Sequence, residues 1–250
     1  MNTQLGLETC SPFIRSQFQP AAPALASSGA SLHRFAVTIS RQTGSGAHAV
    51  GEMLAQYLQS QSPKGSSPWR LFDRDLAEKV LEDHNLPLRY TRFMPEDRIS
   101  EVADTMDELL GVHPPSSSLA RQTAETILRL AQEGNVILIG RGANVVTSKL
   151  DHVLHVRLVG SLEKRVAQIQ KVQAVGREAA QEFIRKEDLG RRRYLKRYFS
   201  EEVDNPLLYH LVINTDLVPY DKAAQMIGDA VLSGLHRKSR NHTDELRTIS

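Results

Sequence analysis

Residues 43–48, Thr43-Gly44-Ser45-Gly46-Ala47-His48, combine residue types and a spacing that suit the binding of a phosphate group. An apolar, β-branched run from Phe35 to Ile39 leads into this glycine turn, and apolar residues at four-residue spacing follow it over 50–58. A strand, a glycine turn and a helix in this order form a phosphate cradle, because consecutive backbone N–H groups and the positive end of the helix converge on an anion. The sequence therefore predicts phosphate binding at residues 43–48, although Gly-Ser-Gly also closes many ordinary strand-to-helix turns.

The turn departs from the complete phosphate-loop pattern, G-x-x-x-x-G-K-[ST]. When the last glycine of that pattern is placed on Gly46, the chain has Arg41, Ala47 and His48 where the pattern requires Gly, Lys and Ser or Thr. The phosphate lysine and the magnesium-binding hydroxyl are missing, and an imidazole replaces that hydroxyl poorly because Mg²⁺ prefers oxygen ligands. Arg41, at the mouth of the turn, is either a substitute for the missing positive charge or a solvated loop arginine.

The elements that must position this turn follow from an alternation of strand-like and helix-like patterns. The expected strands lie at 35–39, 69–72, 135–139, 153–159 and 211–214, and helical periodicity covers 119–130, 162–172 and the segment after Pro219. Ser161 is expected to cap the helix over 162–172. Strands that alternate with helices predict an α/β fold with a parallel five-stranded sheet and right-handed crossovers. Residues 86–118, which contain several prolines, are expected to form a helical insertion.

Two further polar groups follow expected strands, at the edge where open α/β sheets bind their ligands. Arg141 stands between two glycines after the apolar run 135–139. Its guanidinium could clamp a phosphate with two hydrogen bonds or pair with a carboxylate to fasten a turn. Asp73 could orient an acceptor phosphate through Arg74 or hold a metal-bound water, but it could equally cap a helix.

The most basic stretch of the chain is 185–197. It could be a solvated helix face, a nucleic-acid patch with interleaved tyrosines, or a mobile lid whose arginines neutralise a polyphosphate. Its place between the fourth and last strands favours the lid, with Arg191 and Arg192 turned to the phosphates. Asp188 and Arg191 are three residues apart and would share a helix face, where they could read a sugar hydroxyl and a phosphate together.

The composition of the chain gives further evidence on nucleic-acid, membrane, disulfide and metal functions. A net charge of +2 gives no sign of a nucleic-acid partner, and no apolar run approaches the ~20 residues that span a membrane. The single cysteine excludes an internal disulfide and fits a reducing, cytoplasmic compartment. The histidines show no metal-ligand spacing, so no protein-held metal site is predicted. Residues 1–33 are expected to be a disordered extension, 34–235 the folded domain and 236–250 a flexible tail.

Five motifs, in this order, resemble those of the cytidylate kinase-like family, a divergent branch of the nucleoside monophosphate kinases. They are Thr38-Ile-Ser-Arg-Gln-Thr-Gly-Ser-Gly46, Phe72-Asp-Arg-Asp75, Ile139-Gly-Arg-Gly-Ala143, Leu154-His-Val-Arg-Leu158 and Tyr209-His-Leu-Val-Ile-Asn-Thr215. The resemblance implies a P-loop, three-layer α/β/α fold with a monophosphate-binding insertion and an arginine-bearing lid. It also implies ATP and Mg²⁺ as cofactors and CMP or dCMP as the acceptor.

Carried over by position, the resemblance implies a role for each matched residue. Residues 44–46 fall on the donor phosphate loop, and Asp73 and Arg74 fall at the start of the monophosphate-binding segment. Arg141 matches an arginine that contacts the acceptor phosphate, while Asp188 and Arg191 match a lid pair used for the sugar and the phosphates. Two features depart from the kinases: Gly142 replaces an aspartate, and Ala47 and His48 replace the loop lysine and hydroxyl. A loop without the lysine is common in this branch.

The leading hypothesis is an ATP-dependent kinase of CMP or dCMP. Mg²⁺ would bridge the donor phosphates, and Arg41 would substitute for the loop lysine. Arg141, Arg191 and Arg192 would surround the transferring group. A catalytically silent nucleotide-binding or sensing module is the main alternative, and an RNA-binding protein is a third.

Overall fold

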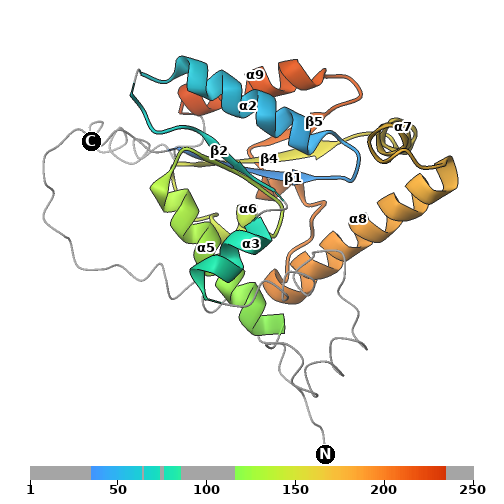
Figure 1. The fold of residues 1–250 in the computed structure, drawn as a ribbon, viewed down its shortest axis with the longest axis horizontal. Helices are drawn as coiled ribbons and strands as arrows, with labels where there is room; N and C mark the ends of the chain where they lie inside the picture. Colours follow the sequence, from blue (N-terminus) through green and yellow to red (C-terminus); the bar gives the residue numbers. More distant parts are fainter. Residues whose placement is uncertain (1–34, 64, 74–75, 86–115, 235–250) are drawn as a thin grey trace, which may run out of the picture.

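A computed structural model describes residues 35–63, 65–73, 76–85 and 116–234. Its centre is a five-stranded sheet in which all pairs are parallel, in the order β2-β3-β1-β4-β5 (Figure 1). The strands are β1 (Ala36–Arg41), β2 (Arg70–Phe72), β3 (Val136–Ile139), β4 (Val153–Val159) and β5 (Leu211–Asn214). The predicted α/β fold with a parallel five-stranded sheet is therefore confirmed.

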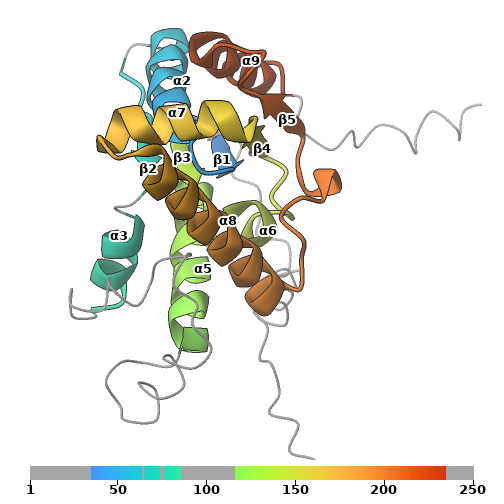
Figure 2. The same ribbon diagram turned by 90° about the vertical axis from the view of Figure 1, so that its right-hand side faces the viewer.

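Helices cover both faces of this sheet and complete the three layers. They are α2 (Ala47–Gln61), α3 (Leu76–Asp83), α5 (Ser116–Glu133), α6 (Ala143–Val146), α7 (Leu162–Gln173), α8 (Arg177–Phe199), the 3₁₀ helix η2 (Pro206–Leu208) and α9 (Tyr220–Leu232). Helices α2 and α9 cover one face, and α5, α6 and the C-terminal part of α8 cover the other (Figures 1 and 2). No helix in the described ranges is long and apolar enough to cross a membrane.

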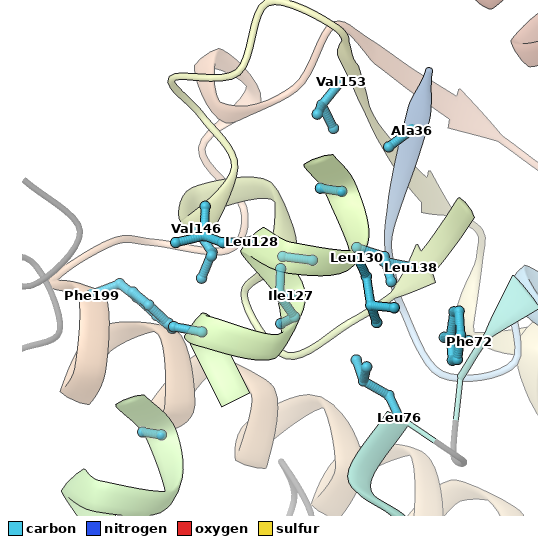
Figure 3. Packing of buried hydrophobic residues seen from close by; sticks show 14 of the residues in the cluster. Ala36, Phe72, Leu76, Ile127, Leu128, Leu130, Leu138, Val146, Val153 and Phe199 are labelled. Carbon is cyan, nitrogen blue, oxygen red and sulfur yellow. The ribbon is translucent and has the colours of Figure 1, made fainter. Parts of the chain in front are cut away.

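Alternation along the strands divides the apolar side chains between two clusters. In β1, Ala36 packs with the cluster under α5, while Val37 and Ile39 pack with the cluster under α2 and α9. Figure 3 shows the first cluster, in which Leu138 of β3 lies near Ile127 and Leu130 of α5. Because the strands are buried on both faces, their sequences read as continuous apolar runs, which is why they could be predicted.

The register brings the loops that carry the polar motifs to one edge of the sheet. β1 is central: Ala36 pairs with Val136 of β3 and with Val153 of β4, and Arg41 pairs with Leu158. The turns after β1, β3 and β4 therefore leave the sheet side by side. Helices α7 and α8 lie beyond this edge, at the right of Figure 1.

In α7, which packs on α8, helical periodicity predicted the apolar face but not which of its residues are buried. Ser161 caps α7 as predicted, because its hydroxyl accepts a hydrogen bond from the Lys164 N–H. Val166 and Ile169 are buried against α8, but Leu162 and Val172, at the ends of the same expected face, are 43% and 68% exposed. This small cluster is separate from the two sheet clusters, so only the middle of α7 is covered.

Several predicted segments lie outside the described residues. They are the extension at 1–33, the tail at 236–250 and most of the expected insertion, at 86–115. Residues 116–118 of that expected insertion instead form the first turn of α5.

Replacement of Leu138 by Ala should lower the free energy of unfolding by about 2–5 kcal/mol, because it leaves a cavity in a fully buried central strand. Leu207 is 89% exposed, so the matched Leu207→Ala variant should change that free energy by less than about 0.5 kcal/mol. Urea denaturation of both variants measures the difference, and equal losses would contradict the assigned core.

Candidate functional site

The turn between β1 and α2 has the geometry of an anion cradle. Gly44 and Gly46 have φ angles of +84° and +81°, which residues with a Cβ atom rarely adopt. The neighbouring atoms also leave no room for a Cβ atom at either position. A Cβ at Gly44 would lie 2.6 Å from the Arg165 carbonyl oxygen, and one at Gly46 would lie 2.2 Å from the Tyr220 ring.

Most backbone N–H groups of the turn have no protein acceptor. Within the described ranges, those of Gly44, Gly46, Ala47 and His48 have no hydrogen-bond acceptor, whereas the Ser45 N–H donates to the Gln42 carbonyl oxygen at 3.2 Å. These donors gather at the positive end of α2, where a phosphate group would satisfy them.

The Asp188 carboxylate, from α8, joins this turn to the two helices beyond it. Its Oδ1 accepts hydrogen bonds from the Thr43 N–H and hydroxyl, both at 2.8 Å, and from Arg191 Nη2 at 2.6 Å. Its Oδ2 accepts from Arg165 Nη1, on α7, at 2.8 Å. Arg191 Nη2 also donates to the Thr43 hydroxyl, and Arg165 Nη1 to the Thr43 carbonyl oxygen at 3.1 Å.

These contacts govern the charge of Asp188. Burial alone would raise the pKa of this carboxyl, but the hydrogen bonds from Thr43 and Arg191 outweigh it and hold the pKa below its ordinary value. Asp188 is therefore ionised at neutral pH, and it balances part of the charge of two largely buried guanidinium groups.

Four arginines line a narrow hollow beside Asp188: Arg41, Arg157, Arg191 and Arg192. Arg157 is 5% exposed and donates to Ser40 Oγ at 2.9 Å and to Asp204 Oδ1 at 2.6 Å. Asp204 also pairs with Arg192 at 3.1 Å. Sequence reasoning missed Arg157, although a guanidinium inside an apolar strand is a signal that could have identified it.

Asp73 faces the first turn of α2. Its Oδ2 lies 3.1 Å from His48 Nδ1, and its Oδ1 lies 4.0 Å from Arg41 Nη2. His48 Nε2 in turn lies 3.4 Å from Glu52 Oε1. Carboxylate oxygens therefore flank the imidazole that replaces the usual hydroxyl. Arg74, which was predicted to act with Asp73, lies outside the described residues.

Arg141 follows β3, on the opposite side of β1 from Arg157. It has φ +52° and stands between Gly140 at +84° and Gly142 at +68°, so the turn holds a strained arginine. A Cβ at Gly142 would lie 2.5 Å from the Phe199 ring. A side chain at position 142, such as the aspartate of the resembled motif, would therefore meet the Phe199 ring of α8.

A larger pocket of about 440 Å³ lies on the other side of the turn, between α7 and the connection from β5 to α9. Its lining includes Gly44, Gln168, Lys171, Asp216 and Tyr220. Burial, and secondarily the charge of Asp216, raises the pKa of Tyr220, which stays a neutral phenol. Sequence reasoning missed this pocket because its walls come from three distant segments.

The structure thus brings most of the predicted site residues to one edge of the sheet. Thr43, Asp188 and Arg191 are in direct contact, and Arg41 and Arg192 line the adjoining hollow. Arg165 also belongs to this set, although it was not among the predicted site residues. Among the described residues, no group of three or more His, Cys, Asp or Glu side chains could hold a metal ion.

Comparison with known proteins agrees with this architecture. The model of the cytidylate kinase-like family matches residues 36–217. No curated protein matches the sequence. An uncharacterised protein from Eubacterium ventriosum shares the fold at 17% identity, with a TM-score of 0.58 over 80% of this chain and 99% of the other. Shikimate kinase from Bacteroides thetaiotaomicron is more distant, at 12% identity and a TM-score of 0.44 over 79% of this chain and 98% of its own.

Gly46→Ala should destabilise the protein more than Gly65→Ala does. Both glycines have a similar positive φ, which costs a Cβ-bearing residue about 1–2 kcal/mol, but only Gly46 also faces the Tyr220 ring. Thermal unfolding of the two variants separates the backbone cost from the steric cost. Equal destabilisation would contradict the packing of Tyr220 on the turn.

Proposed function

The chain belongs to the cytidylate kinase-like family, and we propose that it is an ATP-dependent nucleoside monophosphate kinase that phosphorylates CMP or dCMP. The observation that carries the proposal is the set of unsatisfied backbone N–H groups at Gly44 and residues 46–48, at the head of α2. Such a set suits a polyphosphate, and the neighbouring arginines suit the charge that develops when a phosphoryl group is transferred.

The donor nucleotide is assigned to the turn and to the larger pocket. The β- and γ-phosphates would lie on the N–H groups of Gly44 and residues 46–48, and the adenosine would occupy the pocket walled by α7 and Tyr220. Lys164 and Lys171 also line this pocket, and their ammonium groups suit a phosphorylated ligand.

The phosphate of the acceptor would lie beside the arginines that line the hollow. A phosphate oxygen of CMP would attack the γ-phosphorus while the bond from that phosphorus to the β–γ bridging oxygen breaks, which releases ADP. This in-line transfer needs positioning and charge neutralisation more than covalent chemistry. We assign the neutralisation to Arg41, Arg191 and Arg192, with Arg141 on the acceptor phosphate.

Magnesium, which the family implies, fits the head of α2. Mg²⁺ is usually held by one or two carboxylates together with substrate phosphates, and Asp73 offers such oxygens beside His48. When it is bound with ATP, Mg²⁺ would supply charge neutralisation on the donor phosphates. Asp73 would hold the ion and also keep Arg41 near the turn.

A catalytically silent nucleotide-binding module is the second candidate. It is favoured by Ala47 and His48, which supply neither the lysine nor the hydroxyl of the complete phosphate loop. This candidate predicts saturable nucleotide binding without any product.

The direct test is product formation from ATP and Mg²⁺ with CMP, dCMP, UMP, AMP and GMP, followed by ion-exchange separation of the nucleotides. The kinase predicts diphosphate formation that is fastest with CMP or dCMP. Binding of ATP without any diphosphate product would support the silent module instead.

Arg41→Ala should lower kcat by about a hundredfold or more, the loss expected when one electrostatic contact to the transition state is removed. Arg185→Ala is a matched control from the basic stretch, because Arg185 is exposed and pairs with Glu182 within the same helix. The control should stay within about twofold of the parent rate. If Arg41→Ala has the same kcat as the parent protein, Arg41 does not take over the role of the missing loop lysine.

A further inference from the structure

We propose that the Asp188 carboxylate occupies a phosphoryl-binding seat in the free protein and must leave it when a polyphosphate binds. The seat consists of the Thr43 N–H and hydroxyl with the guanidinium groups of Arg165 and Arg191. The inference rests on the proposed function in one respect, namely that the adjacent turn takes the phosphates of a nucleoside triphosphate.

The donor set of this seat is the one that suits a phosphoryl group. A backbone N–H, a hydroxyl and two guanidinium groups all donate to the two oxygens of Asp188, at 2.6–2.8 Å. Guanidinium groups and backbone N–H groups bind phosphate and carboxylate oxygens with similar geometry, so one anion can replace the other.

The seat adjoins the unsatisfied N–H groups of the turn. Thr43 directly precedes Gly44, whose N–H is the first of that set. A polyphosphate that binds the N–H groups of Gly44 and residues 46–48 can therefore extend to Thr43. Its terminal phosphoryl group would there meet the Asp188 carboxylate. Two anions cannot share this position without strong repulsion.

Arg191 gives an independent sign that the seat is incompletely filled. This arginine is 7% exposed, and its buried Nε has no hydrogen-bond partner within the described part of the chain. A buried donor without an acceptor is costly, and a tetrahedral phosphoryl group carries more oxygens than a carboxylate with which to satisfy it.

Displacement of Asp188 would also change how α8 is held. Asp188 ties α8 to the turn through Thr43 and to α7 through Arg165. A phosphoryl group in the seat would keep both arginines bound but would release the carboxylate from Thr43. Asp188 thus acts as an internal competitor of the donor phosphates.

The test is calorimetric titration of inorganic triphosphate into the parent protein, Asp188→Asn and Glu187→Gln. Asn keeps the shape of Asp and one acceptor oxygen but removes the competing charge. Glu187 is the matched control, because it also pairs with Arg191, at 3.3 Å, and its loss raises the local positive charge equally. Asp188→Asn should bind triphosphate about tenfold more tightly than Glu187→Gln.

Equal affinities of the two variants, or weaker binding by Asp188→Asn, would overturn the competitor role while leaving donor binding at the turn intact. No binding of triphosphate by any of the three proteins would overturn the proposed donor site and this inference with it. Neither result depends on whether CMP is phosphorylated.

A second measurement uses the parent protein and does not depend on the folding of a variant. The ¹³C resonance of the Asp188 carboxyl carbon, in protein labelled at aspartate, should shift when triphosphate saturates the site. A shift toward the resonance of a solvent-exposed aspartate carboxylate reports that the carboxylate has left the two guanidinium groups. Saturation without any shift would show that Asp188 stays in place and would refute the proposal.

Discussion

The candidate site depends on one interaction, the set of hydrogen bonds that Asp188 accepts from Thr43, Arg165 and Arg191. It joins the turn after β1 to α7 and α8, which otherwise pack on each other through a small apolar cluster. Two guanidinium groups this deeply buried would be costly without a carboxylate, since an unpaired buried charge costs several kcal/mol. The two guanidinium charges that Asp188 balances could also be balanced by a phosphoryl group.

The sheet explains why the polar groups meet. The parallel register places the turns after β1, β3 and β4 at one edge, and glycines at positions 44 and 46 let α7 and Tyr220 approach the first turn closely. The fold thus supplies positive charge from the flanking elements at a turn whose own sequence lacks the customary lysine.

Much of the fold could be predicted from the sequence because the central strands are buried on both faces and read as apolar runs. The turn itself could be found because Gly44 and Gly46 follow such a run within a few residues. Leu162 and Val172 were less informative, since a helical face does not reveal whether another element covers its ends.

The site was predicted only in part. Arg41, Asp188 and Arg191 stood out by their motif or spacing, but Arg165 and Arg157 did not, because their roles arise from contacts across more than a hundred residues of sequence. Sequence periodicity can predict that an arginine lies in a helix, but it cannot predict which distant loop its side chain contacts. The hydrogen bond between Asp188 and Thr43 also joins residues that are far apart in the sequence. The Asp188 carboxylate was therefore expected to contact a ligand rather than the turn.

The central claim is that the turn after β1 holds the phosphates of a nucleoside triphosphate. Its most direct test is a competition titration by calorimetry, with ATP added to the protein in the absence and presence of inorganic triphosphate. The account predicts saturable binding of ATP that triphosphate weakens competitively, because both ligands need the same backbone N–H groups. ATP binding that is unaffected by saturating triphosphate, or no ATP binding at all, would contradict it.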